Sequence, residues 1–386
     1  MVYAGANSGS FELARRDLRE LAELEITSER VRRATLRNGQ ARRKLEQRLQ
    51  EAFLQKTIPQ QLHQGPADKD APPLAVVMSD GGRYQRFDRG NEKPESGSFW
   101  KESRIAVLLS MQTQSHQRDP NAELPDFLQD VSIAKKLAQI GKVAGENPEA
   151  EQKPANAEPP WQRPEMVSKE VIASGKNWKE FGPMVASRAW YQGFFASTEK
   201  VFVSDGSSVI EAMQQEWFSN FTSVLDIMHA LSYSLAAARA IYSDLPESWE
   251  CYRRFAKLIW QGNVEEVIAE LDCHQKRLGE PAKDTNETDA REIVRRARVY
   301  YRNHRGRMNY PEYRRKGYPL TSSIMESTVK QVGQRVKGTE KFWSSDGGEA
   351  ILGLRSDYLS ASQPMDAYWR LAKAAADGFR AYGMAG

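Results

Sequence analysis

Two aspartates stand where short apolar runs end, and each is followed directly by glycine. Residues 201–203 (VFV) precede Asp205, and residues 74–78 (LAVVM) precede Asp80. An apolar run that stops in this way predicts a buried strand with a carboxylate at its C-terminal end. Carboxylate oxygens on rigid elements are the ligands that Mg²⁺ takes in proteins. The two segments therefore indicate a metal site built from strand-end acids, although Asp-Gly is also an ordinary turn signal.

Further acids occupy comparable positions. Residues 222–225 predict another buried strand, which ends on Asp226 with His229 three residues later. Glu326 falls in the first turn of a helix predicted for residues 326–337, where the helix dipole favours an ionised carboxylate. A first-turn glutamate is usually no more than a dipole partner. Glu326 therefore gains a chemical role only if the fold brings it to the other acids.

The elements that must position these acids alternate between strand and helix. Residues 84–87 and 103–111 predict two strands after a Gly-Gly turn, and residues 209–217 predict a helix behind Asp205. The chain then becomes helical throughout, with three-to-four spacing in residues 230–242, 249–260, 264–278 and 289–303. The sequence thus predicts an α/β domain with a mixed sheet, flanking helices and an all-helical interruption.

The N-terminal residues 1–60 are predicted to be helical and to bind DNA. Residues 11–24 carry leucines at helical spacing, a three-residue break follows, and a basic helix ends at the C-cap Asn38-Gly39. This layout is typical of a helix-turn-helix, and arginine suits phosphates and guanine edges. A solvated arginine face on a helical hairpin is the rival interpretation. The arginines expected to contact DNA are Arg30, Arg32, Arg33 and Arg37.

A second basic block spans residues 291–316 and contains ten Arg or Lys residues, two acids and four interleaved tyrosines. Basic residues mixed with aromatics suit a groove that follows a phosphate backbone. A solvated basic helix explains the block equally well. In and after this block, the candidates for DNA contact are Arg314, Arg315, Lys316, Lys330, Arg335 and Lys337.

Bulk composition leaves room for a catalytic domain with attached helices. The chain has 386 residues, 40% hydrophobic and 27% charged, with a net charge of +4, which predicts two or three domains. No apolar run is long enough for a membrane span, and we expect no signal peptide. The two cysteines lack metal-site spacing, so a reducing cytoplasm is expected. Residues 145–160 are acidic and proline-rich and predict a flexible surface segment.

Four segments carry a resemblance to a known family. They are VVMSDGG around Asp80, VSDGS around Asp205, LDIMH ending at His229, and the run from Arg307 to Trp343 (RMNYPEYRRKGYPLTSSIMESTVKQVGQRVKGTEKFW). In this order they resemble the DDE transposases with a ribonuclease-H-like fold, most closely the Kra-type transposases of bacterial insertion sequences, with kinship to the hAT and Mutator groups. The resemblance covers about residues 74 to 360, and the N-terminal helices resemble the family only loosely.

The resemblance implies a function and a site. Asp80, Asp205 and Glu326 would be the catalytic acids and would hold two Mg²⁺ (or Mn²⁺) ions for phosphodiester cleavage and strand transfer. Asp226 and His229 would support the site. The partners would be double-stranded DNA, as terminal inverted repeats and target, and further copies of the chain, in a nucleoid-associated cytoplasmic location.

The same resemblance implies a division of the chain. Residues 1–60 would bind DNA, residues 74–228 would form the first part of the catalytic domain, residues 229–317 a helical insertion, and residues 318–386 the catalytic helix and C-terminal helices. Two alternatives stay open: a catalytically inactive or domesticated DNA-binding protein, and a non-transposing ribonuclease-H-like nuclease.

Two local features qualify the resemblance. Thr321-Ser322-Ser323 stands where the family usually has Gly-Ser-Gly, and this exchange is tolerated only if φ stays negative. A third Ser-Asp-Gly, around Asp346, has no apolar strand before it. We therefore predict that Asp346 lies in a simple turn and has no catalytic role.

Overall fold

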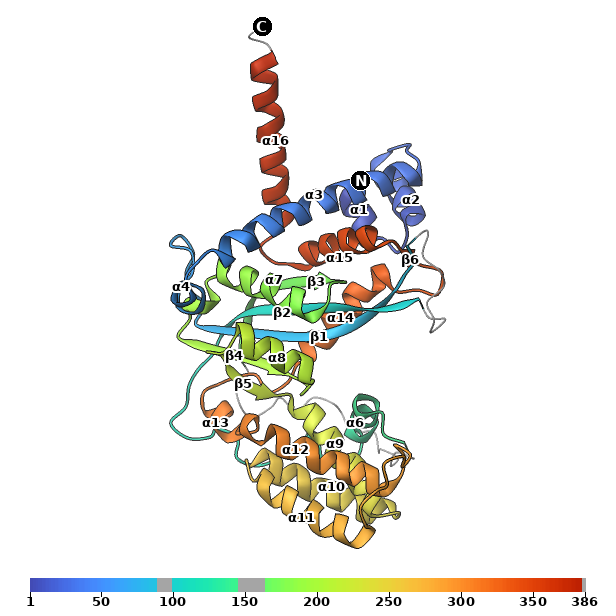
Figure 1. The fold of residues 1–386 in the computed structure, drawn as a ribbon, viewed down its shortest axis with the longest axis vertical. Coiled ribbons are helices and arrows are strands. Elements are labelled where there is room, and N and C mark those ends of the chain that lie inside the picture. The colour runs from blue at the N-terminus through green and yellow to red at the C-terminus, as the bar shows by residue number, and fades with distance from the viewer. Residues whose placement is uncertain (89–98, 145–163, 384–386) are drawn as a thin grey trace.

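A mixed β-sheet forms the centre of the protein (Figure 1). The computed structural model describes residues 1–88, 99–144 and 164–383, with side chains up to residue 373. Within this part of the chain the sheet has six strands in the order β3-β2-β1-β4-β5, with β6 beside the far end of β1. β1 and β3 run antiparallel to β2, whereas β4, β5 and β6 continue the sheet in parallel. The strands are β1 Leu74–Arg86, β2 Trp100–Gln112, β3 Glu165–Ser174, β4 Glu199–Ser204, β5 Thr222–Leu225 and β6 Phe342–Trp343.

Helices cover both faces of this sheet, because consecutive residues of its central strands are apolar and point alternately to the two faces. Val77 of β1 packs in one hydrophobic layer with α7 (Trp178–Tyr191) and α8 (Ser208–Trp217). Its neighbour Val76 belongs to the opposite layer, which includes α14 (Ser323–Val336). The α/β class and the flanking helices predicted from the sequence are confirmed.

The first strand is longer than the sequence suggested. β1 does not turn at Gly81-Gly82 but continues as far as Arg86, with Gly81 opposite Arg104 and Gly82 opposite Ser103 of β2. A Cβ on Gly82 would stand 2.7 Å from Ser103 Oγ. The two glycines therefore serve the close approach of two strands, and the predicted Gly-Gly turn is wrong. β3 was not predicted at all.

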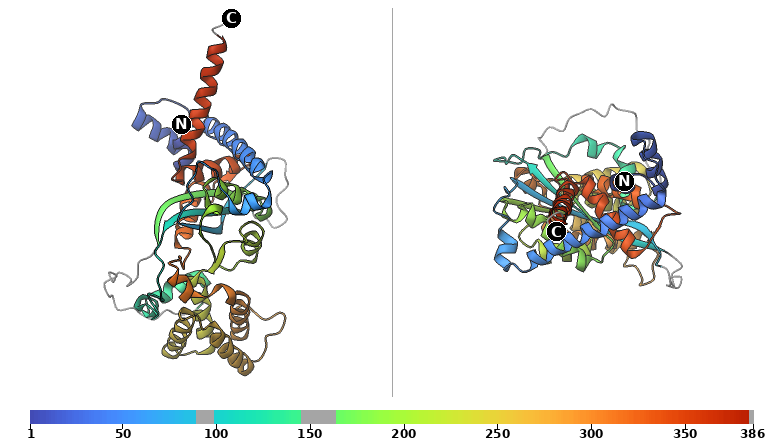
Figure 2. Two further views of the ribbon diagram at one scale, coloured as in Figure 1. Left: turned by 90° about the vertical axis from the view of Figure 1, so that its left-hand side faces the viewer. Right: turned by 90° about the horizontal axis from the view of Figure 1, so that it is seen from above.

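A helical lobe lies beyond the β5 edge of the sheet (Figure 1; Figure 2, left). The four long helices predicted for this part of the chain are present, and each lies within a few residues of its predicted bounds. The chain enters the lobe from β5 and returns to α14 at one point, where Ile227 N donates to Leu320 O over 3.0 Å. The lobe comprises α9 Ile227–Ile241, α10 Leu245–Trp260, α11 Val264–Leu278, α12 Ala290–His304, η2 Arg305–Arg307 and α13 Tyr310–Arg315, with α5 Asp126–Gln129 and α6 Ile133–Gly141 beside it.

The N-terminal helices lie at the opposite end of the molecule (Figure 1). α3 does not end at Gly39 as predicted, but runs from Ser28 to Leu54, 27 residues in all. A Cβ on Gly39 would stand 2.8 Å from Ala350, so this glycine marks a close helix crossing rather than a C-cap. α3 lies across α15, which itself packs on β3 (Figure 2, right). The N-terminal helices are α1 Val2–Asn7, α2 Phe11–Ala22, α3 Ser28–Leu54 and α4 Ile58–His63. The remaining helices are η1 Phe194–Ala196, α15 Ser345–Leu359 and α16 Pro364–Gly383.

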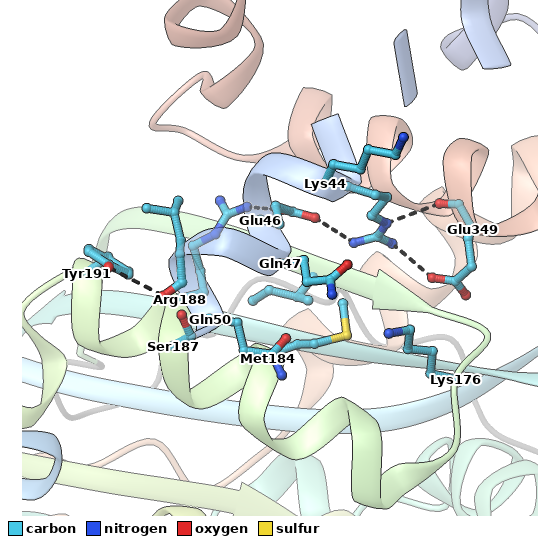
Figure 3. Close-up of a pocket in the computed structure, with 13 residues that line it drawn as sticks. Lys44, Glu46, Gln47, Gln50, Lys176, Met184, Ser187, Arg188, Tyr191 and Glu349 are labelled. Carbon is cyan, nitrogen blue, oxygen red and sulfur yellow. Dashed lines mark hydrogen bonds and ion pairs between the residues drawn. The ribbon is translucent and has the colours of Figure 1, made fainter. Parts of the chain in front are cut away.

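Ion pairs join α3 to the body of the domain (Figure 3). Arg43 pairs with Glu46 at 2.7 Å and with Glu349 of α15 at 3.7 Å, and Arg188 of α7 also pairs with Glu46. Arg42 is buried and pairs with Asp357 at 2.9 Å. The second half of α3 is thus bound into the domain by its own arginines.

One prediction falls on residues that the structure does not describe, and another concerns membrane-spanning helices. The flexible segment predicted for residues 145–160 lies outside the described residues. Among the helices of the described residues, none has both the length and the apolar character that crossing a membrane requires.

Candidate functional site

Asp80 and Asp205 lie beside each other on adjacent parallel strands. β1 and β4 pair in register from Leu74 with Glu199 to Met78 with Val203, and the same register continued two residues further pairs the two aspartates. Neighbouring strands are about 4.8 Å apart. Because side chains alternate, both aspartates face the layer that contains Met78, Val203 and α14. The structure therefore brings together the two acids that the sequence singled out.

Local hydrogen bonds hold each aspartate in place. Gly81 N donates to Asp80 Oδ1 over 2.6 Å, and Ser207 N donates to Asp205 Oδ1 over 2.9 Å. The turn after Asp205 needs Gly206, whose φ is +94°, because other residues rarely adopt that conformation. The hydroxyl of Tyr300 on α12 donates to the Asp205 carbonyl over 2.8 Å. The helical lobe thus contributes directly to the placement of Asp205.

Glu326 reaches the same face of the sheet from α14. This helix packs along β1, and Val329, three residues after Glu326, lies 3.6 Å from where a Cβ on Gly82 would stand. The Glu326 carboxylate is close enough to contribute to the electrostatics of Asp80. Asp80, in the middle of β1, therefore has both Asp205 and Glu326 near enough for their charges to act on it.

The pKa of Asp80 is raised to about 6. Burial is the main cause, and the neighbouring charges of Asp205 and Glu326 add to it. The hydrogen bond from Gly81 and the charge of His229 act in the opposite direction without cancelling the rise. The neighbouring carboxylates therefore make ionisation of Asp80 less favourable, in addition to the effect of burial.

Asp226 is a buried connector between three elements. It follows β5 and caps α9, where Met228 N donates to Asp226 Oδ1 over 2.7 Å. Its other oxygen accepts hydrogen bonds from Ser322 N at 2.8 Å and from the Ser322 hydroxyl, at the start of α14. Burial alone would raise the pKa of Asp226, but the nearby His229 and the hydrogen bonds from Ser322 outweigh it and the pKa is lowered. This ionised carboxylate fixes the N-terminus of the helix that carries Glu326.

His229 lies between Asp226 and the acid pair. Its Nδ1 is 3.6 Å from Asp226 Oδ2. Burial lowers the pKa of His229, but the charges of Asp226, Asp205 and Asp80 raise it more, and the net shift is upward. A protonated His229 would offset part of the negative charge at the site. Its position agrees with the supporting role expected from the sequence.

The residues at the site suit an oxygen-liganded divalent cation. All three donors are carboxylates, which hard cations such as Mg²⁺ and Mn²⁺ prefer. Burial raises the pKa of Asp80, and the charges of Asp205 and Glu326 raise it further, which places these two carboxylates near Asp80. Within the described segments no three His, Cys, Asp or Glu side chains already form a metal-binding group. The adjacent pair Asp80 and Asp205 is therefore the part of the site that the fold assembles in advance.

The predicted DNA contacts divide into exposed and buried residues. Four arginines are exposed on the first half of α3, and Glu29 pairs with two of them at 2.6 and 2.7 Å. These exposed arginines are Arg30, Arg32, Arg33 and Arg37.

Arg314 and Arg335 are buried, which contradicts the predicted DNA contact. Arg314 is 0% exposed, pairs with Asp119 and lies 4.1 Å from the centre of the Trp260 ring. Arg335 is 2% exposed, donates to the Gly5 carbonyl, and lies between the rings of Phe11 and Trp343. Both guanidinium groups connect distant segments of the fold, which composition alone does not show.

The rest of the second basic block is largely neutralised by acids. Arg315 pairs with Glu312 at 2.6 Å, and Lys316 contacts the same carboxylate at 3.9 Å. The interleaved tyrosines are buried rather than available for stacking on bases. The structure thus agrees with the solvated basic helix. The paired arginines near α12 and their acids are Arg291 with Asp289, Arg295 with Glu292, Arg296 with Glu287, Arg298 and Arg302 with Asp272, and Arg305 with Glu265.

Lys330 and Lys337 remain exposed on α14 and line a groove beside the acids. Among the DNA-contact candidates in and after the second basic block, these two lysines lie near the acids. Neither has an acidic partner among the described residues.

Some residues at the site were missed by sequence reasoning. Ser322 was noted only as a departure, yet it binds Asp226, and its φ of −98° explains why glycine is not needed there. Tyr300 was read as part of a nucleic-acid groove, yet it holds the Asp205 carbonyl. Asp346 lies in the first turn of α15, capped by Ser344, so the predicted simple turn is a helix N-terminus.

Comparison with known proteins gives no further guide to the site. No model of a known protein family matches the chain, and no curated protein matches it at a significant level.

Proposed function

We propose that the protein is a divalent-metal-dependent nuclease and DNA strand transferase with a ribonuclease-H-like catalytic domain of the DDE type. The observation that carries the proposal is the parallel register of β1 and β4, which, continued two residues beyond Met78 and Val203, places Asp80 within β1 beside Asp205 just after β4. Glu326 on α14, at the same face, supplies the third acid. Support also comes from the strand order, in which an antiparallel β1-β2-β3 unit is continued by parallel β4 and β5.

Asp80, Asp205 and Glu326 would hold Mg²⁺ or Mn²⁺ in this proposal. When bound, two such ions would activate water or a 3′-hydroxyl and stabilise the leaving oxygen of a phosphodiester. The residues of the chain position the ligands: Gly81 and Ser207 orient the two aspartates, and Asp226 holds the start of α14 through Ser322. These fixed contacts keep the carboxylates ready in a rigid arrangement.

A non-transposing nuclease on the same sheet is the second candidate. The observation in its favour is α3, which crosses α15 at Gly39 and is held there by Arg42 and Arg43. The predicted end-reading helix is therefore part of a longer structural helix. The exposed arginines of its first half remain the proposed DNA reader for a transposase, which would act as an oligomer on DNA in the nucleoid.

Cleavage of a labelled DNA duplex with Mg²⁺ or Mn²⁺ tests the proposal. We expect the wild type to cleave, and Asp80→Asn, Asp205→Asn and Glu326→Gln to lose cleavage while still binding the duplex. Asp346→Asn, in the third Ser-Asp-Gly, is the matched control and should cleave normally. Joining of a 3′-hydroxyl oligonucleotide to a plasmid separates the transferase from the simple nuclease. A folded wild type that cleaves no DNA with either metal would refute the proposal and leave the inactive DNA-binding alternative.

A further inference from the structure

We propose that a groove between α14 and the β1–β2 ribbon holds the phosphate backbone of one polynucleotide strand and leads it to the acids. This inference rests on the proposed function, because it assigns the path of that function's substrate. The groove has a volume of 550 Å³ and is lined by Gly82 and Arg83 on one side and by Lys330, Gly333, Gln334 and Lys337 on the other.

The groove begins at the candidate site. Gly82 lies two residues beyond Asp80 on β1, and Val329, which also lines the groove, lies three residues beyond Glu326 on α14. From there the groove follows α14 toward its C-terminus. A strand lying in it would therefore have one end between Asp80 and Glu326, where the proposed chemistry takes place.

The polar residues of α14 form one row along this path. Lys330, Gln334 and Lys337 are four and three residues apart, which places them on one face of the helix. The rise of about 1.5 Å per residue spreads the row over roughly 10 Å. Arg83 stands on the opposite wall. This arrangement offers cations on both sides of an elongated ligand, as a phosphate backbone requires.

The cationic side chains in this groove are free to bind a phosphate, whereas those of the predicted basic block are already paired with acids. Arg83, Lys330 and Lys337 are exposed, and the described residues provide no ion-pair partner for any of them. By contrast, Arg302 and Arg305 near α12 each pair with a carboxylate. A cation that already has a partner gains less from a phosphate, because the existing pair must first be broken. The structure therefore favours the groove over α12 for holding the backbone.

Gly333 supplies an independent observation. Glycine inside a helix costs about 1 kcal/mol relative to alanine, so it is unfavourable in the middle of α14. A Cβ on Gly333 would meet nothing within 4 Å, so packing does not require the glycine. It lines the groove, where a side chain would narrow the space left for a ligand. Close approach of a ligand backbone is the remaining use of a glycine at this position.

The inference is tested by measuring binding by fluorescence anisotropy in a chelating buffer. The labelled ligands are single-stranded DNA, single-stranded RNA of the same sequence, and duplex DNA. The triple variant Arg83→Gln, Lys330→Gln, Lys337→Gln should bind a single strand less tightly. The slope of log affinity against log salt should also fall, by about 0.7 for each phosphate that the variant no longer neutralises. The double variant Arg302→Gln, Arg305→Gln removes paired charges and should bind like the wild type.

Gly333→Leu tests the path without changing charge. Leucine favours the helix, and a Cβ at this position meets no neighbour, so the variant should fold at least as stably as the wild type. It should bind a single strand at least about tenfold more weakly, which corresponds to 1.4 kcal/mol. Gly306→Leu, at another open glycine outside the groove, is its control and should bind normally. The comparison of the DNA and RNA strands shows which polynucleotide fits.

The outcomes separate the groove from the proposed function. The groove assignment is overturned if Gly333→Leu binds and cleaves like the wild type. It is also overturned if the Arg302 and Arg305 variant loses as much salt dependence as the triple variant. Neither result affects the proposal for the acid site. If the groove variants lose single-strand binding while the wild type cleaves nothing, the groove is upheld and the nuclease proposal fails. Binding restricted to duplex DNA would also overturn a single-strand path.

Discussion

Replacing Asp80 with asparagine should stabilise the metal-free protein above neutral pH. The carboxyl group has an unfolded pKa near 3.8 and a folded pKa of about 6, raised mainly by burial and further by Asp205 and Glu326. Between these values the folded state binds more protons than the unfolded state, so stability falls as the pH rises. Asparagine has nearly the same shape and no charge, and it can still accept the hydrogen bond from Gly81.

The size of this effect follows from the shift. A difference of about 2 pH units at about 1.4 kcal/mol per unit gives an upper bound near 3 kcal/mol. Because Asp80 is only partly enclosed, solvent screening reduces this, and we expect a gain of about 1.5–3 kcal/mol at pH 8. Below about pH 4 both states of the wild type are protonated, and the variant should have no advantage.

Urea denaturation in a chelating buffer at several pH values between 4 and 8 measures the difference directly. The stability of the wild type should decrease between pH 4 and pH 6 relative to Asp80→Asn, and the two curves should then run parallel. Added Mg²⁺ should stabilise the wild type at pH 8 and should have much less effect on the variant.

Asp346→Asn provides the control, because it removes an exposed carboxylate from a helix N-terminus. That variant should show no gain at pH 8, and it should keep the wild-type response to Mg²⁺. If Asp80→Asn is no more stable than the wild type at pH 8, or if its advantage is the same at pH 4, folding does not raise the pKa of Asp80, and the argument from its burial and from its charged neighbours fails.

Three further predictions concern the hydrogen bond from Ser322 to Asp226, the buried Arg314, and Asp346 in the third Ser-Asp-Gly. Ser322→Ala should cost about 1.5–3 kcal/mol in unfolding free energy and slow cleavage, because Asp226 loses one of its charge-assisted hydrogen bonds; normal cleavage in this variant would contradict the role given to that hydrogen bond. Arg314→Ala should destabilise the protein by about 3–5 kcal/mol in thermal or urea unfolding, because it leaves Asp119 without its buried partner; a stable variant with no defect except weaker DNA binding would restore the original assignment of Arg314 to DNA. Asp346→Asn should keep full cleavage in the labelled-duplex assay, and its inactivation with the fold intact would mean that the wrong acids were chosen.

The helices after β5 were predictable because a three-to-four spacing of apolar residues reports one buried face. Each helix of the lobe buries such a face, and sequence spacing is enough to locate it. The acids could be located for a similar reason, since β4 and β5 are short buried runs that stop at Asp205 and Asp226.

Partners distant in the sequence account for what could not be predicted. Gly81 and Gly82 carry a strong local turn signal, but pairing with β2 keeps them in an extended strand. β3 begins with three exposed residues, of which Met166 and Val167 are apolar, and buries only its second half, so its pattern resembles neither an alternating nor a continuous apolar strand. Arg314 was counted as a free charge, because its partner Asp119 is 195 residues away.

The meeting of Ile227 and Leu320 has a consequence for how this architecture can vary. Both ends of the helical lobe leave the sheet at one place and are joined there by a backbone hydrogen bond. With respect to the sheet and its flanking helices, the lobe is therefore a closed loop. The entropy cost of closing such a loop rises only slowly with the number of residues inside it. Helices could be gained, lost or exchanged there without moving the strand ends. What such an exchange must preserve is a tyrosine at the position of Tyr300, since its hydroxyl reaches across the junction to the Asp205 carbonyl.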